Sequence, residues 1–150
     1  MRTHAELQAD LRRPGRRVTD QRRVILDVVR GTDAHPAADW VYRKVRRRLP
    51  RISLGTVYRN LKLLADQGLI QELDSRGLGR YDGNSVRHYH FTCQVCGQIS
   101  DLAETVDRGL DGRMAQRTGL EIWHHRIEFY GRCLTCRSRA GRRAGARKAR

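Results

Sequence analysis

The chain has 150 residues and a mass of 17.3 kDa, which is enough for one domain or two small ones. Lys and Arg number 31 against 16 acidic residues, giving a formal net charge of +15 that favours a polyanionic partner, most simply nucleic acid or an anionic membrane. No apolar run reaches the ~18 residues of a transmembrane helix, and the N-terminus lacks the apolar core of a signal peptide. We therefore expect a cytoplasmic protein without a membrane partner, whose four cysteines bind metal rather than form lasting disulfides.

The basic residues are unevenly distributed along the chain. Residues 1–70 carry 16 basic and 7 acidic side chains, residues 71–136 carry 8 and 9, and residues 137–150 carry 7 and none. This asymmetry predicts two domains, of which the first binds an anion. Residues 138–150 contain no apolar side chain larger than Ala, which predicts a disordered basic tail.

Two helices are expected at the start of the first half. Residues 19–30 place valine and isoleucine on one helical face, with Thr19 or Asp20 as the N-cap. Pro36 suits the first turn of a second helix, and Pro50 ends it.

A third helix and a hairpin follow. Ser53 is a favourable N-cap for this helix, and Gly68 can close it in the left-handed conformation. A strand at 69–73, a turn at 75–79 and a strand at 80–82 read as a β-hairpin. Three helices and a hairpin in a basic segment are typical of a winged helix-turn-helix domain, whose third helix enters the major groove. A three-helix protein-binding module with a merely solvated basic face is the alternative.

The third helix carries polar residue types that reach base edges and phosphates. The candidates on its polar face are Ser53, Thr56, Arg59, Asn60 and Lys62. Tyr58 can stack on a thymine methyl group or donate to a phosphate, and it can equally belong to the core because it adjoins the apolar stripe.

The four cysteines form two CxxC pairs, Cys93–Cys96 and Cys133–Cys136, separated by 36 residues. Each pair offers two thiolates from a tight turn, and two such turns complete a closed four-thiolate shell that suits structural Zn²⁺. A thioredoxin-like redox motif is the competing interpretation, but it needs only one pair. Zinc would also stabilise a second domain with few large apolar residues.

A second set of potential ligands precedes the first pair. His88 and His90 point to the same face if this segment is a strand, and Asp82, Asp101 and His35 offer further donors. Such a mixed nitrogen and oxygen shell suits Fe²⁺ or Mn²⁺ better than the thiolate site does, although Zn²⁺ would also bind. The alternative is that both histidines only pack or face solvent.

A third cluster, His124-His125, lies in EIWHHRIEFYG, which reads as a strand. Its histidines would point to opposite faces and so could not share one metal without distortion. We treat His125 as a candidate accessory ligand and His124 as an ordinary histidine.

Together these motifs resemble the ferric uptake regulator family of bacterial metal-dependent repressors, from about Gly15 to Cys136. The segments that carry the resemblance are RVTDQRRVIL, HPAADWVYRKV, ISLGTVYRNLKLLADQGLI, RYDGN, HYHFTCQVCGQISDL and HHRIEFYGRCLTC. The resemblance implies an α+β fold, with a winged helix-turn-helix DNA-binding domain followed by a small α/β dimerisation domain with a four-cysteine zinc site. We place these domains at 1–83 and 84–137, with a hinge at about 80–86.

The resemblance also implies a regulatory Fe²⁺ or Mn²⁺ site at the hinge. Its ligands, carried over by position, are His35, Asp82, His88, His90 and Asp101. Aspartate at both carboxylate positions is similar to the peroxide-sensing members, in which iron oxidises a ligand histidine, here His35 or His88. Arg87 and Tyr89 cannot ligate as the residues that often build a further site in iron-uptake members do.

For DNA, the resemblance points to Tyr58 and Arg59, and to Arg17 near the first base contacts. We expect a homodimeric repressor on a palindromic operator, not an enzyme, that senses peroxide. The family alternative is a sensor of iron, manganese or zinc availability. A zinc hydrolase or deaminase is disfavoured because neither HExxH nor PCxxC occurs. A zinc-ribbon adaptor for RNA or protein is the remaining alternative.

Overall fold

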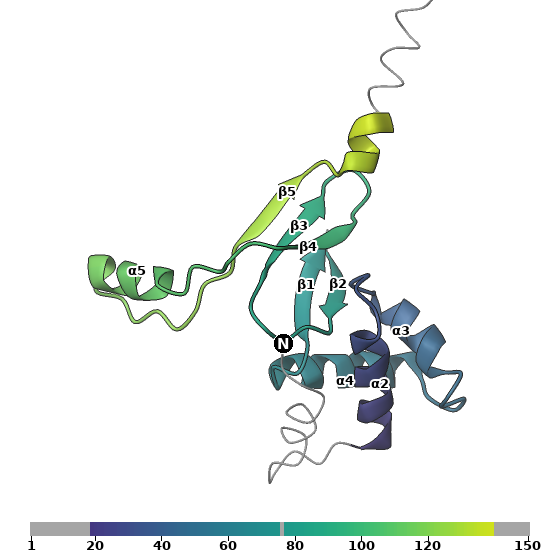
Figure 1. Ribbon diagram of the computed structural model, residues 1–150. Helices are drawn as coiled ribbons and strands as arrows, with labels where there is room; N and C mark the ends of the chain where they lie inside the picture. Colours follow the sequence, from purple (N-terminus) through teal and green to yellow (C-terminus); the bar gives the residue numbers. More distant parts are fainter. Residues whose placement is uncertain (1–18, 76, 140–150) are drawn as a thin grey trace, which may run out of the picture. The chain divides into compact units, whose positions relative to one another are not determined.

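The computed structural model describes residues 19–75 and 77–139, and the chain divides into two compact units after Val86. We call them unit 1 and unit 2. In the described part of the chain, unit 1 contains three helices and a two-stranded hairpin, whereas unit 2 is built around a separate sheet. These elements are labelled in Figure 1. Among the described residues, no helix has the length and apolar character needed to cross a bilayer. The predictions for Arg17 and for most of the basic tail, from residue 140 on, lie outside the described residues.

The helix ends of unit 1 follow local sequence signals. Helix α2 (Asp20–Arg30) is capped by Thr19, whose hydroxyl accepts a hydrogen bond from the Arg22 amide at 3.4 Å. Helix α4 (Leu54–Asp66) is capped in the same way by Ser53. Gly68 has φ 66°, a left-handed conformation that suits a residue without Cβ. These predicted caps are confirmed.

Helix α3 (Ala38–Val45) is shorter than expected at both ends. Its N-cap is Ala37, one residue after Pro36, so the proline precedes the helix rather than occupying its first turn. At the other end, the amide of Arg48 bonds to the Val45 carbonyl three residues back, which tightens the chain into turns before Pro50. The proline therefore follows a turn and not a helix.

The three helices and the hairpin share one apolar core. Eleven of its side chains are at most 2% exposed, which is the packing expected of a protein interior. They are Ile25, Leu26, Val29, Ala38, Val41, Val45, Val57, Leu61, Leu64, Leu69 and Ile70.

Strands β1 (Gln71–Ser75) and β2 (Leu78–Asp82) form the antiparallel hairpin, or wing. The first strand begins two residues later than predicted, because Leu69 and Ile70 bury their side chains in the core before pairing begins. Ser75 pairs with Leu78, so the turn is also tighter than the predicted 75–79.

A further segment runs along β2. The Tyr81 amide donates to the Pro36 carbonyl at 3.0 Å, and Ala37 forms an antiparallel bridge with Arg80. Continuing this register by two residues from the Ala37–Arg80 bridge sets His35 opposite Asp82. Residues 47 positions apart in sequence thus become neighbours through backbone pairing.

Unit 2 contains a mixed three-stranded sheet in the order β4-β3-β5. Strand β3 (Tyr89–Cys93) lies between β4 (Ile99–Leu102), which is antiparallel to it, and β5 (Glu128–Gly131), which is parallel to it. Helix α5 (Leu110–Thr118) lies in the long connection, and residues 134–139 are helical. The predicted α+β class is confirmed. The predicted strand in EIWHHRIEFYG is wrong over residues 121–127, which form no regular element before β5.

Candidate metal centres

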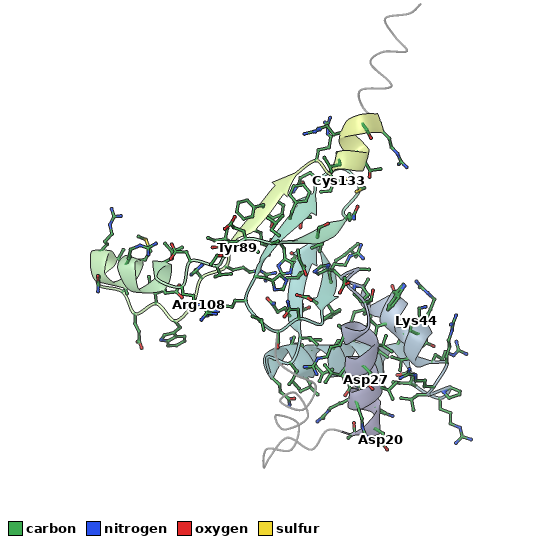
Figure 2. All side chains as sticks on the ribbon, viewed as in Figure 1. Asp20, Asp27, Lys44, Tyr89, Arg108 and Cys133 are labelled. Carbon is green, nitrogen blue, oxygen red and sulfur yellow. The ribbon has the colours of Figure 1, made fainter. Side chains whose placement is uncertain are left out.

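The two CxxC pairs meet at one end of the unit 2 sheet. Cys93 ends β3, and Cys133 follows β5, the strand that is parallel to β3; Figure 2 shows Cys133 near these strand ends. The four Sγ atoms all lie within 4.8 Å of one another, and those of Cys96 and Cys133 are 3.8 Å apart. A tetrahedral Zn²⁺ with Zn–S bonds of ~2.3 Å separates its sulfurs by about 3.8 Å. The four cysteines therefore fit a closed structural zinc site.

Two thiols of this cluster differ in how readily they ionise. The amide of Cys133 donates to Cys93 Sγ at 3.3 Å, and with the Cys96 amide it lowers the pKa of Cys93 to about 6. The sulfurs around Cys136, Cys133 first, raise the pKa of Cys136 to about 12. Cys93 thus ionises readily whereas Cys136 resists ionisation, and a bound metal ion would stabilise the thiolate of Cys136.

Three nitrogen and oxygen donors converge elsewhere in unit 2. His90 and Asp101 are directly paired across β3 and β4, so their side chains share one face of the sheet. Asp101 Oδ1 lies 3.2 Å from His88 Nε2 and 3.5 Å from His90 Nε2, and the two imidazole centroids are 4.2 Å apart. His90 is 4% exposed. The expectation that His88 and His90 share a face is met, and the geometry suits a mixed metal shell.

Unit 1 holds two more donors. His35 and Asp82 are both buried, and they offer ligand atoms within 4.8 Å of each other, as the pairing along β2 requires. His35 has φ 47°, which is uncommon for a residue with a Cβ atom and costs conformational energy. Strain and burial at a potential ligand are typical of a functional position.

The segment after Asp82 is held by one side chain that sequence reasoning missed. Gln71 Nε2 donates to the carbonyls of Asn84 at 2.7 Å and Val86 at 3.2 Å, and it lies 3.5 Å from Asp82 Oδ2. The Asn84 amide donates to Asp82 Oδ1 at 2.8 Å. Gln71 therefore orients a candidate ligand and the chain leading out of unit 1. Nothing in the local sequence signals this role, because its partners lie across the hairpin.

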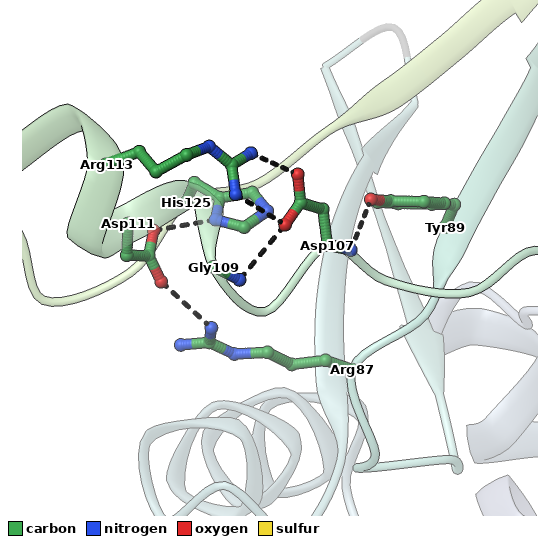
Figure 3. A network of polar contacts seen from close by, with 7 residues as sticks. All are labelled: Arg87, Tyr89, Asp107, Gly109, Asp111, Arg113 and His125. Atoms are coloured by element: carbon green, nitrogen blue, oxygen red, sulfur yellow. Dashed lines mark hydrogen bonds and ion pairs between the residues drawn. The ribbon is translucent and has the colours of Figure 1, made fainter.

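A polar network connects α5 to the start of β3 (Figure 3). Asp111 accepts from Arg87 at 3.4 Å on one oxygen, while its other oxygen is 2.6 Å from His125 Nδ1. Hydrogen bonding to His125, with a further contribution from Arg87, lowers the pKa of Asp111. His125, the candidate accessory ligand, is thus engaged with a carboxylate that also binds a cation, which favours an ion-pair network over a metal site. His124 is exposed.

The predicted DNA-binding residues of α4 divide into two groups. Tyr58 is 47% exposed and Arg59 is exposed, so Tyr58 is not a core residue. Asn60 is only 8% exposed: its Oδ1 accepts from Arg22 Nε at 3.2 Å and its Nδ2 donates to the Thr56 carbonyl at 2.8 Å. This corrects the expectation that Asn60 lies on the exposed polar face, since it joins α2 to α4 instead.

The model of the ferric uptake regulator family matches residues 13–130. The chain belongs to the ferric uptake regulator family. Among curated members, it is 35% identical to the "Peroxide-responsive repressor PerR" of Staphylococcus aureus (strain USA300) over 132 residues, which cover 87% of this chain and 89% of that protein.

Two solved structures extend the family assignment. The Campylobacter jejuni peroxide stress regulator is 28% identical with a TM-score of 0.68, and the match covers 91% of this chain and all of that one (100%). A zinc-bound manganese uptake regulator is 32% identical with a TM-score of 0.59, covering 85% and 98% of the two chains. The family contains sensors of different signals on one fold, so the signal must be argued from the ligands of this chain.

Proposed function

We propose that this protein is a homodimeric, metal-dependent transcriptional repressor that senses peroxide through oxidation of a ligand histidine. The observation that carries the proposal is the separation of two donor sets. One contains only thiols, and the other contains only imidazoles and aspartates. The first suits a permanent zinc ion, and the second suits an exchangeable Fe²⁺ or Mn²⁺.

We propose that the regulatory ion is shared by donors from both units. His35 and Asp82 would supply the unit 1 ligands, and His88, His90 and Asp101 would supply those of unit 2. A shared ion would restrain the two units, and so fix the spacing of the two α4 helices of a dimer to match a palindromic operator. Losing a ligand would release that restraint and lower the affinity for DNA.

The proposed chemistry destroys a ligand. A bound Fe²⁺ would lend one electron to cleave the O–O bond of H2O2 and regain it as the ring is oxidised, chemistry that Mn²⁺ does not readily support. Of the ligands, imidazole rings contain oxidisable carbons, whereas carboxylates resist oxidation and the thiols are held apart on zinc. His35 or His88 would gain one oxygen atom from the peroxide while the other oxygen leaves as water. The oxidised ring would be a poorer donor, so the two units would separate.

Several features support DNA binding and dimerisation. The exposed residues of α4 and its N-cap, Ser53, Tyr58 and Arg59, with half-buried Thr56, are the proposed reading side chains. In unit 2, Trp123 is 80% exposed, Leu120 63% and Tyr130 55%, and such exposed apolar surface is typical of a subunit interface. A chromosomal operator would place the protein in the cytoplasm.

The test compares operator binding by the Fe²⁺, Mn²⁺ and Zn²⁺ forms before and after a brief micromolar H2O2 pulse, with peptide mass spectrometry. We expect one added oxygen on the His35 or His88 peptide of the Fe²⁺ form only, together with release of DNA. The exposed His124 peptide is the internal control, because diffusing oxidant would reach it too. Unchanged binding with both histidines unmodified would refute peroxide sensing.

A second candidate, sensing of metal availability, is favoured by the 32% identity to the manganese uptake regulator. It predicts that DNA binding follows the free concentration of one ion and is insensitive to peroxide. Arg59→Ala tests the DNA interface separately. We expect it to cost about 1–3 kcal/mol on the operator and to relax sequence preference.

A further inference from the structure

Unit 1 carries a dense basic segment that the metal sites and the reading face of α4 do not use. Six of the nine residues from 43 to 51 are Lys or Arg, and no acidic residue occurs between positions 40 and 65. We call Arg43–Arg51 the basic segment. Its six cationic side chains are all exposed. They are Arg43, Lys44, Arg46, Arg47, Arg48 and Arg51.

The fold forces these side chains outward. Val45 is fully buried, Ile52 is 6% exposed, and Leu49 packs against the core of unit 1. Backbone hydrogen bonds from Leu49 to Val45 at 2.9 Å and from Ile52 to Leu49 at 3.1 Å hold the loop in place. With three apolar anchors pointing inward, the intervening basic residues must face solvent on a fixed backbone.

Aromatic rings orient two of the six cations. Lys44 Nζ lies 5.1 Å from the ring centre of Trp40, and Arg46 Cζ lies 5.8 Å from that of Tyr42. Figure 2 labels Lys44 on α3, where several nitrogen-tipped side chains project from the unit. Within the described part of the chain, no carboxylate forms an ion pair with the six cations. With respect to the described residues, the segment is therefore a patch of like charge without acidic ion-pair partners.

The position of the basic segment, next to the N-terminus of α4, indicates which kind of partner it would bind. Arg51 precedes Ser53, the N-cap of α4, by two residues, so it lies within ~8 Å of that helix end along the chain. The major groove is about 12 Å wide, and duplex DNA carries about one negative charge per 1.7 Å of its axis. A surface this close to a helix in the groove would meet the phosphates at the edge of the groove.

We propose that the basic segment is a second DNA-binding surface, which contacts the phosphate backbone beside the groove entered by α4. This inference rests on the proposed function, because α4 must enter the groove. The segment supplies affinity and salt dependence, whereas α4 supplies sequence preference. Duplex DNA fits this surface better than a membrane or an apolar protein partner, because either of those would bind exposed apolar side chains. Between residues 40 and 57, all of which are described, no large apolar side chain is exposed.

The experiment compares the triple variant R47Q/R48Q/R51Q with the matched triple R108Q/R117Q/R132Q. Both remove three exposed arginines per chain, but the second set lies in unit 2. The probes are a duplex selected from a randomised pool by the Mn²⁺-loaded wild-type protein and a scrambled duplex of the same length. Affinity for each is measured between about 50 and 200 mM salt, with zinc content and the thermal midpoint as checks of folding.

We expect the basic-segment variant to reduce the slope of log affinity against log salt by about 2–3 per subunit. The ratio of the affinities for selected and scrambled duplex should remain that of the wild type. The unit 2 variant should keep the wild-type slope. An equal loss of slope in both triples would overturn the inference, because it would reflect net charge alone.

Two further comparisons distinguish failure of this inference from failure of the proposed function. If wild-type binding requires Mn²⁺ and Arg59→Ala relaxes specificity, but R47Q/R48Q/R51Q binds like the wild type, the inference fails and the proposed function stands. If wild-type binding requires no metal and shows no preference for the selected duplex, the proposed function fails. Vesicles of phosphatidylglycerol and phosphatidylcholine form the last arm. Loss of vesicle binding in the triple, with unchanged DNA binding, would assign the segment to a membrane.

Discussion

The two units of this protein stabilise themselves by different means. Unit 1 buries a continuous apolar core, to which α2, α3, α4 and the wing all contribute. Over residues 87–139, the described part of unit 2, the buried apolar residues are few, namely Tyr89, Cys93 and Ile99, and α5 has no buried residue. Tyr89 packs edge-on against Phe129 with ring centres 5.8 Å apart, yet Phe129 is itself 45% exposed.

This difference indicates how each unit depends on its surroundings. A domain with a small core needs a metal or a partner to fold, whereas one with a packed core does not. Unit 2 has features suited to both: a four-cysteine cluster that can bind a metal, and exposed apolar side chains such as Trp123 that a partner can cover. We therefore expect unit 1 to remain folded without metal, and the fold of unit 2 to depend on zinc.

The largest expected effect comes from breaking the zinc site. Cys93→Ser removes a fully buried sulfur, so unit 2 should lose its bound zinc and its fold while unit 1 remains folded. Amide-resolved NMR should show loss of dispersed resonances from residue 87 onward and retention of those before it. Thr135→Ser, between two ligands of the second pair, is the control and should keep one zinc per chain. A folded, zinc-free unit 2 in Cys93→Ser would contradict the comparison.

The converse change breaks the core of unit 1. Leu64 is fully buried, so Leu64→Ala should destabilise unit 1 by about 2–5 kcal/mol through lost burial and a residual cavity. Urea unfolding of unit 1 and the zinc content of the chain are the two measurements, and zinc should be unaffected. The neighbouring Leu63 is 40% exposed, and Leu63→Ala should cost far less. Similar losses for both variants would show that the core is not as well packed as described.

A smaller effect is expected at Gln71, which holds the residues that follow the proposed ligand Asp82. Gln71→Ala removes the amide that holds the Asn84 and Val86 carbonyls, so Asp82 would be less well oriented. Outer-shell losses of this kind typically cost 10–100-fold in metal affinity, and we expect about 10-fold for Mn²⁺ by calorimetric titration. Exposed Gln116 in α5 provides the matched control variant, Gln116→Ala. Unchanged Mn²⁺ affinity in Gln71→Ala would remove its positioning role.

The smallest effect appears only at alkaline pH. Burial, with a contribution from Glu72, raises the pKa of Tyr81 from 10.0 to about 12. A raised pKa in the folded state means that the stabilisation is complete below pH 10 and is lost as the pH rises towards 12. Unit 1 of the wild type should thus lose stability over this window, and Tyr81→Phe should remove that part of the loss. Urea unfolding of the wild type and Tyr81→Phe at pH 9 to 11 measures the difference, and equal losses of stability in both proteins would contradict the assignment to Tyr81.

Much of the architecture was predictable because the signals are local. Thr19 and Ser53 cap helices through their own hydroxyls, and Gly68 adopts a left-handed conformation that favours glycine. The CxxC spacing constrains two sulfurs to one turn, and an HxH pair in a strand shares a face. These features depend on a few neighbouring residues, so the sequence by itself determined the helix caps, the two-thiol turns and the shared face of His88 and His90. The pairing of β3 with β5 then brings the two turns together.

The remaining features depend on contacts between distant segments, which only the tertiary structure decided. Asn60 was expected on the surface of α4, but the approach of Arg22 from α2 buries it. The HHRIEF segment has the alternation of a strand, yet only its end pairs with β3, while His125 bonds to Asp111. His35 faces Asp82 because the chain before α3 pairs with β2, and no local pattern encodes that register. Periodicity states which face a side chain occupies, whereas packing determines what lies opposite it.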